Sequence, residues 1–123
     1  MLEKEAMLPA LTPPQMEALS RFAAFEMRVD ELRAALTGAF DFDLAPEHRT
    51  ARTHFRVPEP GIAITRTHID NALHQKRLGR ITERDLADWA TLLLLNDAYV
   101  LDPGDEDLIA EWLNDLSLNL DAA

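Results

Sequence analysis

The sequence predicts a single, mainly α-helical domain over residues 1–123, built as an irregular bundle of about four helices. Apolar residues recur at steps of three and four along most of the chain, which is the spacing of amphipathic helices. Helix-capping residues precede these stretches. With 123 residues, 47% of them hydrophobic, the chain is long enough to form one core without metals or disulfides.

The first helix is expected over residues 13–37, after a loosely ordered leader at residues 1–11. Thr12 is a favoured N-cap residue, a proline follows it, and Gln15 completes a capping-box pattern. Gly38 is the natural residue to end this helix. Its continuous apolar face consists of Met16, Leu19, Phe22, Phe25, Val29, Leu32 and Leu36.

Residues 39–64 contain three prolines and a glycine, which exclude a long regular element. Phe40 and Phe42 alternate with aspartates, and Ile62 and Ile64 repeat the alternation, a pattern typical of a half-buried strand. Two options stay open for this stretch. It forms either a short β-hairpin or an extended segment packed over the helices.

Two further helices are expected at residues 66–78 and 83–95. Thr65 and Thr82 precede them as N-caps, and Gly79 lies where the first of them should end. The short connection predicts an antiparallel helical hairpin. The inward stripe of the second helix consists of Leu86, Trp89, Ala90, Leu93 and Leu94.

Residues 96–104 are predicted to form a turn region that leads into the last helix. Three consecutive acidic residues, 105–107, occupy the first turn of that helix, where negative charge suits the helix dipole. Residues 117–123 are expected to form a short tail. The inward set of the last helix consists of Leu108, Ile109, Trp112, Leu113 and Leu116.

Composition excludes several kinds of chemistry. Because the chain has no cysteine, it has no disulfide, no zinc–thiolate site and no cysteine nucleophile. The first residues lack the basic and apolar regions of a signal peptide, and no apolar run approaches the ~20 residues of a membrane span. We therefore expect a cytoplasmic protein without a membrane partner.

Charge is distributed unevenly along the chain, whose formal net charge is −10. Residues 48–84 hold eight basic and three acidic side chains, whereas residues 85–123 hold ten acidic side chains and no basic one. An acidic excess repels phosphate backbones, so nucleic acid is disfavoured as a partner.

This charge pattern predicts a small acidic protein that acts by binding another protein, one that is basic. An acidic C-terminal surface would attract such a partner and accelerate its association. The expected partner-binding residues are Asp88, Asp105, Glu106, Glu111 and Asp115.

Residues 64–94, ITRTHIDNALHQKRLGRITERDLADWATLLL, carry Ala72-Leu73, Gly79-x-Ile81 and Leu86-x-x-Trp89-Ala90. In these features the stretch resembles small, uncharacterised bacterial helical proteins, some of which are similar to the immunity proteins that neutralise partner toxins. The resemblance covers about a quarter of the chain and implies no catalytic residues. It favours an immunity-type or inhibitor-type role.

A second hypothesis is an anion-binding protein or an enzyme that uses the histidine- and arginine-rich segment 48–74. A pocket between the beginning of this segment and His68 or His74 would hold an anionic ligand. Clustering of two histidines in one cleft would support the idea. The candidate anion-binding residues are His48, Arg49, Arg52, His54 and Arg56.

Known catalytic and metal-binding patterns are not found in the sequence. Asp70 and His74 lie four residues apart, a spacing that favours a surface ion pair on one helix face. The acidic residues at 105–107 lack the glycine and glutamate positions of a calcium loop, and no His-Glu-x-x-His pattern occurs. We therefore expect no catalytic residues, no metal and no cofactor, and a protein that is not an enzyme.

A third hypothesis is a homodimer with a structural role. Further apolar side chains beside the main apolar stripe of the expected first helix widen its face, which would bury against a second copy. The side chains that widen it are Ala23, Ala24, Met27, Ala34 and Ala35.

Overall fold

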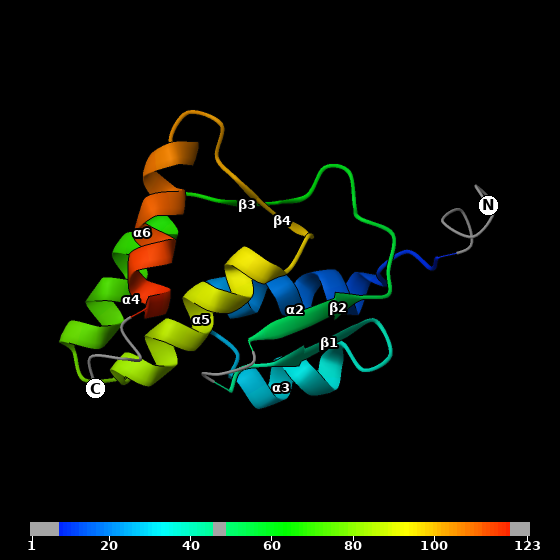
Figure 1. Ribbon diagram of the computed structural model, residues 1–123, viewed down its shortest axis with the longest axis horizontal. Coiled ribbons are helices and arrows are strands. Elements are labelled where there is room, and N and C mark those ends of the chain that lie inside the picture. Colours follow the sequence, from blue (N-terminus) through cyan, green and yellow to red (C-terminus); the bar gives the residue numbers. More distant parts are fainter. Residues whose placement is uncertain (1–7, 46–48, 119–123) are drawn as a thin grey trace.

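The computed structural model describes residues 8–45 and 49–118, which form five helices and four short strands (Figure 1). The expected bundle of about four helices is therefore wrong, because the first helix is divided and the chain also pairs strands into two small sheets. In chain order the elements are α2 (Pro13–Ala23), α3 (Val29–Ala35), β1 (Phe40–Asp43), β2 (Thr50–Thr53), β3 (Ile62–Ile64), α4 (Arg66–Arg77), α5 (Glu83–Leu95), β4 (Tyr99–Leu101) and α6 (Glu106–Leu118).

The helix expected over residues 13–37 is interrupted between α2 and α3. Phe25 lies at φ 61°, a left-handed conformation in which its N–H donates to Phe22 O at 3.0 Å. The next N–H, of Glu26, donates to Arg21 O at 2.8 Å. This pair of bonds is the Schellman helix end, which glycine usually makes. The continuous apolar spacing concealed the break, because no glycine marks it.

A tertiary contact holds this helix end in place. A left-handed φ destabilises a residue with a side chain by roughly 1–3 kcal/mol. The Phe25 ring offsets this by stacking on Trp89, with the ring centroids 4.9 Å apart. Beyond the turn, the N–H of Arg28 donates to Glu31 Oε1 at 3.0 Å and caps α3.

The first sheet is an antiparallel hairpin, one of the two options that the sequence left open. Phe40 pairs with Thr53 and Asp43 with Thr50. The phenylalanines of β1 are buried and its aspartates are exposed, as the alternation predicts. After β2 the chain leaves the sheet, where Phe55 is buried and Val57 is exposed.

The second sheet pairs β3 with β4 in parallel, Ile62 opposite Tyr99 and Ile64 opposite Leu101. The sequence predicted only a turn region for β4, because a three-residue strand has little local signature. Gly61 permits the close approach of the segments that lead into β3 and β4. A Cβ at this position would lie 2.8 Å from the backbone oxygen of Ala98, which instead accepts the Ile62 N–H.

Helices α4 and α5 match the expected ranges within one residue. The N-terminus of α4 uses a histidine in the capping box. The Thr65 N–H donates to Nδ1 of His68 at 3.0 Å, so the ring must be unprotonated at that nitrogen. Burial lowers the pKa of His68 below its usual 6.5.

The pKa of His68 is lower in the folded protein than in the unfolded chain. The stability that the neutral His68 ring contributes is therefore present above pH 6.5 and is lost as the pH falls through the folded pKa. Glutamine at this position keeps the cap without titrating. We expect His68→Gln to reduce the loss of stability on acidification by roughly 0.5–2 kcal/mol, the value of one cap. Urea denaturation at about pH 7.5 and about pH 5 measures it. His74→Gln, at an exposed position of the same helix, should keep the wild-type dependence.

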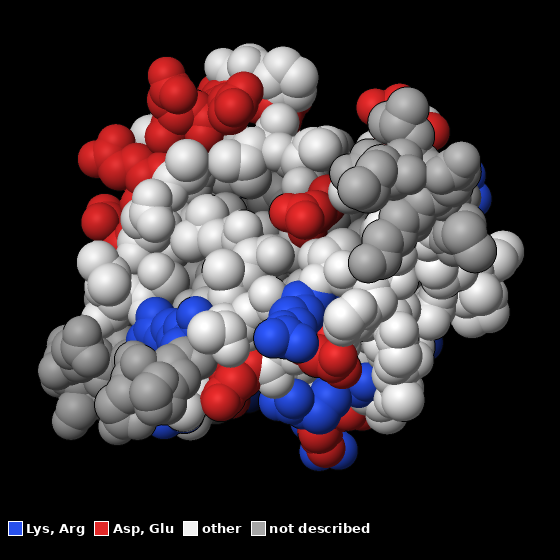
Figure 2. Space-filling model, turned by 45° about the vertical axis from the view of Figure 1, so that its right-hand side comes forward, with Lys and Arg blue, Asp and Glu red and all other residues white. Residues whose placement is uncertain are grey.

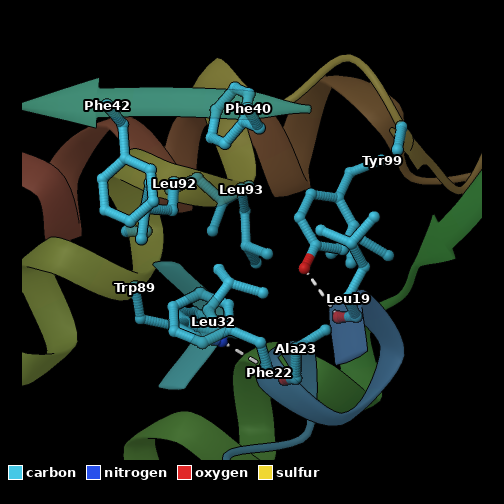
Figure 3. Packing of buried hydrophobic residues seen from close by; sticks show 14 of the residues in the cluster. Leu19, Phe22, Ala23, Leu32, Phe40, Phe42, Trp89, Leu92, Leu93 and Tyr99 are labelled. Atoms are coloured by element: carbon cyan, nitrogen blue, oxygen red, sulfur yellow. Dashed lines mark hydrogen bonds between the residues drawn. The ribbon is translucent and has the colours of Figure 1, made fainter. Parts of the chain in front are cut away.

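The core gathers around α5, which lies in the middle of the molecule with α6 packed against it (Figure 1). Two buried polar groups link the core to α2 (Figure 3). The Tyr99 hydroxyl donates to Leu19 O at 2.6 Å, and Trp89 Nε1 donates to Ala23 O at 3.2 Å. Every helix in the described residues is too short or too polar to cross a membrane.

Both chain ends that the structure describes contact other elements. The N–H of Arg56 donates to Pro9 O at 2.8 Å, and Leu11 packs partly buried against the core. Ser117, which was assigned to a tail, belongs to α6 and is buried. Residues 1–7 of the expected leader and 119–123 of the expected tail lie outside the described residues.

The apolar side chains that were expected to widen a dimer face lie on two separate helices and the turn between them. Ala23 is fully buried and contributes to the core, whereas Ala34 is exposed on α3. Ala24, Met27 and Ala35 are half-buried. The face on which the dimer hypothesis rested is therefore not continuous.

Candidate functional site

The last helix presents an acidic surface. Its inner face buries Ile109, Leu113 and Ser117, which turns the carboxylates outward. No ion pair joins these carboxylates to any basic side chain that the structure describes. Figure 2 shows acidic side chains gathered at one end of the molecule, with no basic ones among them in that view. We call this set the acidic α6 surface: Asp105, Glu106, Asp107, Glu111 and Asp115.

A shallow hollow of about 320 Å³ lies at the beginning of this surface. It is lined by residues 103–108, which include three of the carboxylates. Glu106 and Asp107 are exposed and Asp105 is half-buried. Four of the five predicted partner-binding residues thus lie in α6 or in the turn before it, and the fifth, Asp88, lies on α5.

A larger groove, of about 570 Å³, lies between the α2–α3 turn and the neighbouring ends of α4 and α5. We call it the Phe25 groove. Its volume lies within the range of about 300–1,000 Å³ that is typical of ligand pockets in proteins. Its apolar lining consists of Phe22, Phe25, Met27, Val29, Ile81 and Trp89.

The remaining lining of the Phe25 groove is mostly acidic. It includes two basic residues, Arg28 and Arg80. It also includes five acidic residues, which are Glu26, Asp30, Glu31, Asp85 and Asp88. The groove therefore combines an apolar floor with an excess of negative charge, which suits a cationic ligand with an apolar portion.

Asp88 is a mostly buried carboxylate in the lining of the groove. Its side chain is 16% exposed, and its Oδ1 atom is buried without a hydrogen-bond partner in the described residues. Oδ2 lies 3.5 Å from Nε of Arg84, a long contact for an ion pair. Burial raises the pKa of the Asp88 carboxyl, and the charges of Arg84 and Arg49 only partly oppose this effect.

Since the folded pKa of Asp88 is raised, its ionisation destabilises the folded state once the pH exceeds the ordinary aspartate value. We expect Asp88→Asn to stabilise the protein at neutral pH by roughly 0.5–1 kcal/mol, with the gain shrinking toward about pH 4. Urea midpoints across this pH range measure it. Asp115→Asn makes the same charge change at an exposed position and should have little effect.

Of the five predicted anion-binding residues, the four that the structure describes are not gathered into a cationic pocket. His48 lies outside the described residues. Nη1 of Arg49 donates to Ser117 O at 2.6 Å and lies 3.4 Å from Thr91 Oγ1, so this guanidinium joins the start of β2 to α5 and α6. Arg52 and Arg56 are both exposed.

The described histidines likewise have separate surroundings. Nε2 of His54 lies 3.1 Å from Asp41 Oδ2 across the β1–β2 hairpin. His68 caps α4, and His74 is exposed near the other end of the same helix. None of the three described histidines lines either of the two cavities described above, and the described residues include no group of three or more side chains suited to a metal ion.

Sequence reasoning included Asp88 among the candidate residues but missed the Phe25 groove. The groove depends on the turn at Phe25, which was assigned to the middle of a helix. Asp30 and Glu31 offered a signal, because adjacent acidic residues commonly occupy the first turn of a helix. Together with Arg28 they mark the start of α3.

Comparison with known proteins adds no relative from which a role could be transferred. The sequence matches no protein-family model and no curated protein, and no solved structure matches the chain. The acidic α6 surface and the Phe25 groove are therefore the features on which a functional assignment rests.

Proposed function

We propose that this protein acts by binding a basic partner protein through the acidic α6 surface. One observation carries the proposal: α6 is anchored by an apolar inner face, while its exposed positions carry carboxylates and the helix has no basic residue of its own. Such a surface attracts a basic partner over several ångströms and orients it before contact. Salt at physiological concentration screens exposed charges beyond roughly 8 Å, so the complex should weaken as salt is added.

The experiment is capture of partners from the protein's own cell extract, with wild-type and variant proteins immobilised at low and raised salt. Glu111→Lys combined with Asp115→Lys reverses charge on α6. Glu17→Lys combined with Asp70→Lys makes the same net change at exposed positions elsewhere. The proposal expects a salt-sensitive partner that wild type and the second variant retain and the α6 variant loses.

Two results would contradict this proposal. One is equal loss of the partner in both double variants, which would show that only net charge matters. The other is the absence of any salt-sensitive partner in the wild-type capture. Circular dichroism of each variant shows whether its helices are intact, so that loss of binding is not confused with loss of folding.

An inhibitor or immunity-type role is the more specific form of this proposal. It requires that the captured partner be a basic enzyme or toxin, and that the acidic surface cover its functional site. We propose the cytoplasm as the compartment of this interaction, because a chain without cysteine depends on no disulfide there. Inhibition of the captured partner by wild type but not by the α6 variant tests the inhibitory role.

A further inference from the structure

The Phe25 groove is a second concave feature, and no residue of α6 lines it. Its walls come from the α2–α3 turn on one side and from α4 and α5 on the other. The groove and the acidic α6 surface therefore share no residue. A ligand there would be recognised by a different set of contacts.

The floor of the groove is aromatic and held in a defined position. Trp89 is 1% exposed, and the half-buried Phe25 ring stacks on it at 4.9 Å. The Schellman hydrogen bonds and this stacking together keep Phe25 at an unfavourable φ. Strained residues that the surrounding structure holds in place are frequent at binding sites. The floor of the groove thus presents an aromatic ring whose position is set in advance.

The charges of the groove differ in how fully they are engaged. Arg28 has Asp30 and Glu31 within 3.6 and 3.5 Å, and Asp85 accepts the Thr82 N–H at 2.9 Å. These acidic groups already have partners.

Two other carboxylates have weaker partners. Glu26 lies 4.0 Å from Arg21, with both side chains half or more exposed. Asp88 has one buried oxygen without a partner in the described residues, and its other oxygen lies 3.5 Å from Nε of Arg84. Glu26 and Asp88 belong to different walls of the groove, so a cation between them would gain from both.

A planar guanidinium fits this combination better than an ammonium ion. It stacks on aromatic rings, loses its hydration more readily, and donates two parallel hydrogen bonds to a carboxylate. The methylene stem of an arginine would lie against the apolar lining. Charge complementarity and an aromatic floor therefore select the same occupant.

We propose that the Phe25 groove binds an arginine side chain of a basic partner chain, with its guanidinium over Phe25 and between the carboxylates of Glu26 and Asp88. The inference rests on the proposed function in one respect, that the partner is basic. The protein would then have two contact sites of different kinds: the acidic α6 surface, which attracts a basic partner, and the Phe25 groove, which selects arginine.

The test uses three short peptides in which glycine alternates with arginine, with lysine or with citrulline, the neutral isostere of arginine. Binding to the full chain is followed by NMR of backbone amides. We expect the arginine peptide to shift resonances of residues 25–30 and 85–89. The citrulline peptide, which lacks the charge, should bind about tenfold more weakly than the arginine peptide, the value of one charge-assisted hydrogen bond. The lysine peptide should bind more weakly than the arginine peptide.

Variants assign the effect to the groove. Phe25→Gly keeps a backbone that accepts positive φ while removing the ring, and Asp88→Asn removes the buried charge. Both should weaken the arginine peptide by about tenfold. Asp70→Asn makes the same charge change at an exposed position of α4, outside both the groove and the acidic α6 surface, and should bind the peptide as wild type does.

Equal affinity for the arginine and lysine peptides, shifts confined to α6, or no binding of any peptide would overturn the groove assignment. None of these results would change the interpretation of the capture experiment, because the α6 double variant tests the acidic α6 surface. Conversely, arginine-selective shifts at the groove would stand even if capture found no salt-sensitive partner. The two proposals can therefore fail separately.

Discussion

Replacing Trp89 by alanine is expected to lower the free energy of unfolding by about 3–5 kcal/mol, the range for truncating a buried aromatic residue. Trp89 is 1% exposed in the middle of α5. Its loss would open a cavity, leave Ala23 O without its 3.2 Å donor, and remove the ring on which Phe25 stacks. Urea denaturation followed by circular dichroism at 222 nm, the usual helix wavelength, measures the change.

Two matched variants separate the contributions. Trp89→Phe keeps an aromatic ring but removes the donor, so it should be destabilising by only about 1–3 kcal/mol. Trp112→Ala truncates the other tryptophan, which is half-buried on α6, and should have a smaller effect than Trp89→Ala. A Trp89→Ala protein that unfolds at nearly the wild-type urea concentration would contradict the central place of this residue in the core.

The second large effect is expected for Leu113→Ala, at about 2–5 kcal/mol. Leu113 is fully buried and belongs to the inner face that packs α6 against α5. Because the same helix carries the acidic α6 surface on its outer side, the substitution tests whether that surface depends on the core. The free energy of unfolding is again obtained from urea denaturation.

Leu118→Ala is the matched control, since it deletes the same atoms from the same helix at a position that is 61% exposed. It should change the stability by less than about 0.5 kcal/mol. Similar losses in the two leucine variants would show that α6 does not pack through its Leu113 face. The expected difference comes from burial, because leucine and alanine differ little in helix propensity.

The elements that the sequence predicted well are those with strong local signals. Thr12 with Gln15 and Thr82 with Asp85 form the capping boxes that their spacing indicates. The apolar stripe of α5 is buried apart from Leu94, which is 38% exposed. These signals act within one helical turn, where a residue and its partner lie three or four positions apart.

The candidate sites were predictable only in part. Asp88 was chosen as an exposed carboxylate, yet its side chain is mostly buried and one of its oxygens has no partner in the described residues. Arg49 was chosen as an anion-binding residue, yet its guanidinium donates to Ser117 O, 68 positions away along the chain. In both cases the residue type was evident, but its environment depends on elements distant in sequence.

The sequence by itself determined the helical capping signals, the inward-facing stripes of α5 and α6, and the concentration of negative charge beyond residue 85, because these follow from residue type and short-range spacing. Tertiary structure decided the rest. It broke the first helix at Phe25, where stacking on Trp89 offsets an unfavourable φ, and it paired β3 with β4. It also formed the Phe25 groove from three segments. Each of these features depends on contacts between residues far apart in the chain, which local propensity does not encode.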